Sequence, residues 1–218
     1  MKAFEKWLAN TPHAVTLFVI ADLFESDGFS EWFTALLANH GERLTVGCHG
    51  LTHRSWSAWP EDCEGFEASL KRATAELKEK VGGHFRPWFR APAGYIAPWM
   101  ATTLAGQGYT VDSSVNPSWL VRKKAGKGNS WADVNDAMAQ QGVLERPWAT
   151  RFSLPVNGPA LTKFPLSVIA RGVWKKAPSV LTGSELDAAV PDSTQPLVTL
   201  YWHVLDHARN KKTWTPPL

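Results

Sequence analysis

Short apolar runs rich in β-branched residues alternate along this chain with longer segments whose apolar residues recur every three or four positions. The short runs predict strands and the longer segments predict helices. Successive strand, helix and strand require a parallel crossover, so the order predicts an α/β fold with a parallel sheet. The expected strands are residues 15–21, 44–48, 85–90, 109–113, 143–148 and 197–203, and the expected helices are residues 4–8, 31–39, 60–81 and 98–105.

The length of 218 residues, with 44% hydrophobic and 20% charged residues, is enough to bury a substantial core. We therefore expect one domain over residues 1–218. Residues 114–196 follow the alternation less well, because they are first polar and basic and later rich in proline and glycine. We expect long loops in this part of the chain.

Charge and composition restrict the class of partner. The formal charge of +3 is small and the basic residues are scattered, so no nucleic-acid partner is expected. No uninterrupted apolar stretch is long enough for a membrane span. The two cysteines do not make a disulfide framework and no signal peptide is visible, which favours a cytoplasmic location.

A histidine pair directly follows the second expected strand. His49 and His53 are four residues apart, a spacing at which one helical turn would bring both imidazoles to one metal ion. The alternative is a chance pair, since the chain has seven histidines. Cys48, next to His49, could be a soft ligand, but at a strand end we expect it to be a small buried side chain.

Titratable residues also follow other expected strands. Arg90 begins the segment Arg-Ala-Pro-Ala-Gly-Tyr, in which proline and glycine suit a rigid loop that aims the guanidinium. A structural salt bridge is the alternative for Arg90. His203 ends the last apolar run, and Asp112 lies at the end of the fourth; either could instead have an ordinary structural role.

The succession of these motifs resembles the polysaccharide deacetylase family, the chitin-oligosaccharide deacetylase homology domain. His49-Gly-Leu-Thr-His53, Arg90-Ala-Pro-Ala-Gly-Tyr95, Asp112-Ser-Ser114 and Leu200-Tyr-Trp-His203 match motifs two to five in order and spacing. The resemblance covers about residues 4 to 207. It implies an irregular (β/α) barrel of seven strands, here incomplete because the first strand is absent.

The first motif of the family is missing. It is an Asp-Asp segment that supplies the catalytic base and the third metal ligand, and nothing of this kind stands before residue 15. We expect either that the chain begins after that strand or that this homologue has lost the motif. Asp22 is a conceivable substitute ligand, although a carboxylate after a strand is more often a helix cap.

The resemblance also implies the remaining roles. His49 and His53 would hold a divalent metal, for which zinc suits the ligand set and cobalt or nickel would serve as well. His203 would protonate the leaving nitrogen with Asp112 in support, Arg90 would orient the catalytic carboxylate, and the Tyr95 backbone N–H would bind the oxyanion.

The expected function is therefore a metal-dependent hydrolase that removes an acyl group from the nitrogen of an N-acylated sugar. Without the Asp-Asp motif, its activity is in question. Two alternatives stay open: a carbohydrate-binding homologue that no longer cuts, and an amidohydrolase acting on a small non-sugar amide. Twelve tryptophans could offer platforms for sugar rings, although most large aromatic side chains fill cores.

Overall fold

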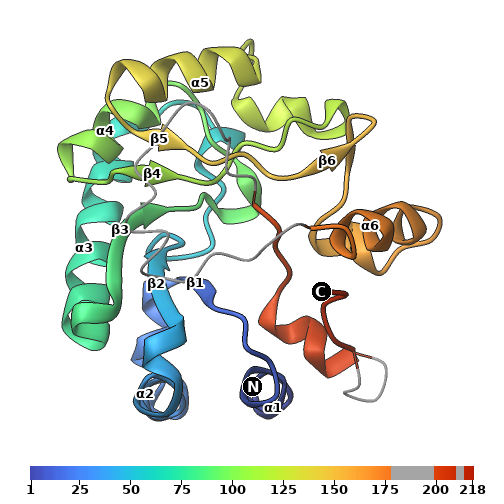
Figure 1. Cartoon of the computed structure of the whole chain (residues 1–218). Helices are drawn as coiled ribbons and strands as arrows, with labels where there is room; N and C mark the ends of the chain where they lie inside the picture. Colours follow the sequence, from blue (N-terminus) through green and yellow to red (C-terminus); the bar gives the residue numbers. More distant parts are fainter. Residues whose placement is uncertain (178–198, 210–213) are drawn as a thin grey trace.

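The computed structural model describes residues 1–177, 199–209 and 214–218. Five parallel strands form its main sheet, and their order in space is their order in the chain (Figure 1). This confirms the prediction of an α/β fold with a parallel sheet. The strands are β1 (Val15–Val19), β2 (Leu44–Cys48), β3 (Phe85–Phe89), β4 (Val111–Asp112) and β5 (Leu144–Glu145).

The helices between successive strands lie along one side of the sheet (Figure 1). They are α2 (Asp27–His40), α3 (Cys63–Val81), α4 (Met100–Gly106) and α5 (Trp131–Gln140). Helix α3 begins where the Asp62 side chain accepts a hydrogen bond from the Gly65 N–H at 2.9 Å. It ends at Gly82, whose φ of 52° suits a residue without a Cβ.

The expectation of long loops over residues 114–196 is wrong for the part that the structure describes. This part contains α5, the antiparallel pair β6 (Thr150–Arg151) and β7 (Leu154–Pro155), and α6 (Leu166–Trp174). Helix α5 begins with a capping box in which Ser130 and Asp133 bond each other's backbone N–H. Helix α5 was not predicted from the sequence, because its polar composition gives a weak apolar periodicity. Residues 178–196 lie outside the described residues.

The resemblance implied a seven-stranded barrel left incomplete by the absence of its first strand, and the described strands form an open five-stranded sheet without a closed barrel. Beyond β5, Trp148 makes an isolated parallel bridge with Thr199, which brings the last segment of the chain to the sheet. Within residues 199–203 no further ladder forms, and none of the described strands joins this segment to β1. The first residues of the sixth expected strand, 197 and 198, are not described.

The two ends of the described chain pack together through aromatic side chains. In α1 (Lys2–Ala9), Trp7 meets the Trp202 ring with centroids 5.2 Å apart, and Phe4 meets the buried His207 at 5.5 Å. Trp202 also contacts Trp174 of α6 at 5.9 Å. Because Trp202 packs against both buried apolar clusters, it connects the core beneath the sheet with the core around α6.

Both cysteines are free, as expected from their number and spacing: Cys48 is buried at the end of β2 and Cys63 is exposed. No helix within residues 1–177, 199–209 or 214–218 combines the length and the apolar character needed to cross a bilayer.

A carboxyl pair lies between β4 and β5, where Asp112 is buried and Glu145 is half-buried. Asp112 and Glu145 are register partners, and their side chains are hydrogen-bonded to each other. Burial raises the pKa of both groups, that of Glu145 well above its ordinary 4.5. Glu145 Oε2 is buried without a donor from the described residues, and the raised pKa values lead us to infer that the two carboxyl groups share a proton.

This shared proton predicts a pH-dependent stability. Since the folded-state pKa of Glu145 is raised, folding binds its proton more tightly, and this stabilisation is complete below about pH 4.5 and is lost as the pH rises through the folded-state pKa. A Glu145→Gln amide can donate to Asp112 at every pH. We expect E145Q to exceed the wild type in unfolding free energy by ~1–3 kcal/mol at about pH 8 and to show a flatter profile.

Urea unfolding between about pH 5 and about pH 9 measures both profiles. The control is Glu79→Gln, an exposed glutamate beside Lys80, which should leave the wild-type profile unchanged. Parallel profiles for E145Q and wild type would show that the pair does not share a proton.

Candidate functional site

The backbone ladder continues past the ends of the central strands and fixes the first residues of their loops. The His49 N–H donates to the Val19 carbonyl at 2.8 Å, and the Arg90 N–H donates to the Cys48 carbonyl at 2.9 Å. The carboxyl ends of parallel strands meet at one edge of a sheet, so these loops start side by side.

The His49 side chain is held by the neighbouring loop. Its Nδ1 lies 2.7 Å from the Arg90 backbone oxygen; since a carbonyl only accepts, Nδ1 carries the hydrogen and Nε2 keeps a lone pair. Burial lowers the pKa of His49 to about 3, with smaller contributions from the charges of Arg90, His53 and His203. The imidazole is therefore neutral at physiological pH, and these four side chains share one neighbourhood.

His53 lies beside His49 but is exposed, and the two rings meet edge to face with centroids 5.3 Å apart. Gly50 makes the turn between them with a φ of 87°, and a Cβ there would meet the Thr52 carbonyl at 3.0 Å. Cys48 is fully buried, and burial raises the pKa of its thiol to about 11. It is a buried side chain, as predicted, and stays a thiol at neutral pH.

The histidine pair lacks a third metal donor among the residues described. No group of three or more His, Cys, Asp or Glu side chains is placed there to hold a metal ion. Asp22 belongs to the 3-10 turn Ala21–Glu25 after β1, and its backbone N–H donates to the Leu51 carbonyl at 3.0 Å. Asp22 thus adjoins the histidine loop without completing a ligand set.

Arg90 is buried among neutral partners, with only 8% of its surface exposed. Its Nε donates to the Ser113 carbonyl and its Nη2 to the Ser113 hydroxyl, each at 3.0 Å. The guanidinium carbon lies 4.5 Å from the Phe18 ring centroid, 5.0 Å from that of Tyr201 and 5.5 Å from that of Trp148. These contacts orient the cation rigidly by hydrogen bonds and cation–π attraction.

His203 has a carboxylate partner that sequence reasoning left without a role. His203 Nδ1 is 3.5 Å from Asp206 Oδ2, and the same oxygen accepts the His203 backbone N–H at 3.0 Å. Asp206 is buried and also pairs with Arg209 at 2.8 Å, so it is held in place. The sequence contained a signal for this pairing, because Asp206 follows His203 by three positions, which is the spacing of a capping box.

Asp112 is occupied elsewhere. Besides Glu145, its carboxylate accepts hydrogen bonds from the Ser114 hydroxyl at 2.6 Å and from the Ser114 N–H at 3.1 Å. Its described contacts therefore do not include His203, the residue it was expected to support. The structure provides Asp206 in that position.

The Tyr95 backbone N–H, expected to bind an oxyanion, donates to the Pro92 carbonyl at 3.2 Å. The turn that makes this bond includes Ala93 at a φ of 53°, a conformation that costs energy for a residue with a Cβ. Lys124 braces the turn by donating to the Ala93 carbonyl at 2.6 Å and lying over the Tyr95 ring. The N–H becomes available to a ligand only if this turn opens.

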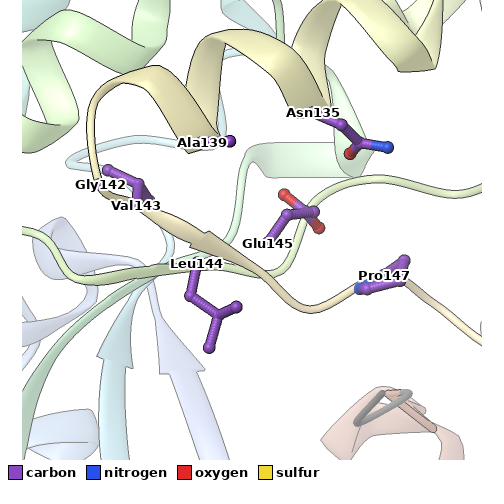
Figure 2. A pocket seen from close by; sticks show the side chains of 7 residues that line it. All are labelled: Asn135, Ala139, Gly142, Val143, Leu144, Glu145 and Pro147. Atoms are coloured by element: carbon purple, nitrogen blue, oxygen red, sulfur yellow. The ribbon is translucent and has the colours of Figure 1, made fainter. Parts of the chain in front are cut away.

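A separate open pocket of about 470 Å³ lies between α5 and β5. Figure 2 shows the Glu145 side chain directed toward α5 and Leu144 directed away from it. None of the predicted site residues lines this pocket; its lining residues are Asn135, Ala139, Gly142, Val143, Leu144, Glu145 and Pro147.

Comparisons with known proteins place the fold. No family model matches the chain. No curated protein matches it in sequence either. A crystal structure of a candidate polysaccharide deacetylase from Mycobacterium smegmatis matches with a TM-score of 0.52 and 19% identity, covering 93% of this chain and 62% of that one. A CE4 esterase from Streptococcus mutans matches with a TM-score of 0.43 and 15% identity, covering 92% and 66% respectively.

The described chain thus spans less than two thirds of the length of each of these proteins. The likeness to the Mycobacterium smegmatis protein extends over nearly all of this chain and concerns the arrangement of its elements. The chain has the fold of the polysaccharide deacetylase family.

Proposed function

We propose that this chain is a hydrolase of the carbohydrate esterase type that removes an acyl group from the nitrogen of an N-acylated sugar. The observation that carries the proposal is the gathering of His49, His53, Arg90 and His203 around one place at the carboxyl edge of the sheet. These are the residues of three separate motifs, and the fold is that of the deacetylases. Fold alone would not identify a reaction.

In this proposal His203 supplies a proton to the leaving nitrogen. Asp206 lies next to Nδ1 of His203, which leaves Nε2 to face a ligand, and 57% of the His203 side chain is exposed. An amine must leave in protonated form, so a positioned acid at this nitrogen lowers the barrier. Asp206 is a positioning residue, because it acts only through the imidazole. The neutral His49 offers Nε2 to a ligand.

We also propose that His49 and His53 bind a divalent metal, with zinc favoured and cobalt or nickel acceptable. The neutral state of His49 and its Nδ1 bond to a carbonyl support this, because metal-bound histidines are oriented by such a second hydrogen bond. When bound, the metal would polarise an acyl carbonyl and activate water. With two imidazoles as the ligands that the described residues offer, we expect weak binding.

A second function has one observation in its favour. Because the described residues lack a third donor for the metal, the site could bind N-acylated sugars without hydrolysing them. A binding protein of this kind would saturate with ligand, release no acid, and be insensitive to chelators.

The first test measures acetate released from N-acetylglucosamine oligomers, with and without added Zn²⁺. We expect slow release by the wild type and a loss of about 10²–10⁴-fold in the rate constant for His203→Gln, because the general acid is removed. Asp206→Asn should lower the rate less than H203Q does and shift its pH profile, as befits a positioning residue.

The control for this test is His84→Ala, which removes a histidine that belongs to the turn before β3 and not to the site. Saturable sugar binding with no acetate release at any metal concentration would establish the binding protein instead. Equal rates for wild type and H203Q would remove His203 from the mechanism.

The metal proposal is tested by calorimetric titration with Zn²⁺. We expect one site of weak affinity in the wild type, at least tenfold weaker binding in His49→Ala and in His53→Ala, and wild-type affinity in His84→Ala. Binding should also weaken as the pH falls, because imidazoles must be deprotonated to bind a metal. Undiminished affinity in both site variants would locate the zinc elsewhere.

A further inference from the structure

The guanidinium of Arg90 is a buried cation without a carboxylate in contact with it. In the part of the chain that the structure describes, no ion pair includes Arg90, and both hydrogen bonds of its guanidinium go to Ser113. Burial lowers the pKa of Arg90 to about 10, which still leaves it protonated at neutral pH. A buried charge without a counter-charge in contact is costly, so this position favours an anion.

The nearest groups do not neutralise it by contact. Asp112 and Glu145 stabilise the charge of Arg90 from a distance, but their oxygens bond Ser114 and Val115 and make no ion pair with it. The imidazoles of His49, His53 and His203, which share this neighbourhood, offer no negative charge.

The bonding pattern of Arg90 leaves donors in a suitable arrangement. A guanidinium has five N–H donors, and the bonds to Ser113 use one on Nε and one on Nη2. The remaining hydrogens, on Nη1 and Nη2, form the end of the fork. A carboxylate accepts such a pair through its two oxygens, which is the strongest geometry for an arginine ion pair.

We propose that Arg90 binds a small free carboxylate, of the size of formate or acetate, end-on through Nη1 and Nη2. The rings of Phe18, Tyr201 and Trp148 surround the guanidinium and only 8% of Arg90 is exposed, so a small anion can approach it with less displacement of these rings than a large one. Low polarity around the pair strengthens it relative to one in water. This binding is independent of hydrolysis, so it holds or fails separately from the proposed function.

The experiment titrates the folded wild-type chain with sodium formate and, separately, sodium acetate, replacing sodium chloride so that ionic strength is constant. The readouts are the side-chain ¹⁵N–¹H NMR signals of Arg90 and the melting temperature. We expect a saturable shift of the Arg90 signals at millimolar formate and acetate, with a rise in melting temperature of a few degrees. Chloride alone should cause neither change.

Variants locate the site. Arg90→Gln should lose the saturable response, while Arg151→Gln, which removes an arginine over the exposed Phe152 ring, should keep it. If R90Q does not fold, Tyr201→Leu takes its place: removing one ring of the enclosure should weaken formate binding at least threefold. If neither variant folds, the formate-dependent shift of the wild-type Arg90 NMR signals is the test of the proposal.

Several results would overturn the proposal. They are Arg90 signals that do not move with formate, equal effects of formate and chloride, and an R90Q response equal to that of the wild type. Glucuronate is titrated as a further arm, because a carboxylate can also be carried by a sugar. Glucuronate binding as tight as formate binding would show that the site accepts a sugar-borne carboxylate, and would overturn the restriction to small anions.

Discussion

The hydrogen-bonded register between β1, β2 and β3 is the constraint on which the rest of the site depends. The ladder does not stop at the strand ends, because the N–H groups of His49 and Arg90 still donate to carbonyls of the neighbouring strand. This fixes two loops side by side, so that the Arg90 carbonyl can accept from His49 Nδ1. The backbone carbonyl of Arg90 therefore sets the tautomer of the His49 imidazole.

Burial then sets the charge states of the site. It holds His49 neutral and leaves Arg90 protonated, although the pKa of both groups is lowered. A neutral imidazole and a rigid cation in one neighbourhood suit a ligand with an electron-poor carbonyl or a negative group. Asp112 and Glu145 behave differently, because desolvation raises the pKa of both carboxyl groups and favours their protonated forms.

The motif residues were predictable from sequence because each follows an apolar run, and the placement of His49, Arg90 and Asp112 at strand ends agrees with that expectation. The partner of His203 was not. The sequence offers both Asp112 and Asp206 as carboxylates for this role. Only the fold shows that the Asp206 carboxylate lies beside His203, whereas Asp112 is bonded to Ser114 and Glu145. The capping box of Ser130 and Asp133 at the start of α5 is also visible in the sequence, but the polar composition of this helix meant that it was not predicted.

The sequence by itself determined the parallel α/β class, the buried cysteine at the end of β2 and the residues that gather at one edge, because strand periodicity and strand ends are local properties. Only the tertiary structure decided that three aromatic rings from distant segments enclose Arg90, and that the carboxylate beside His203 is that of Asp206 and not that of Asp112. These depend on contacts between residues far apart in the chain, which no local pattern encodes.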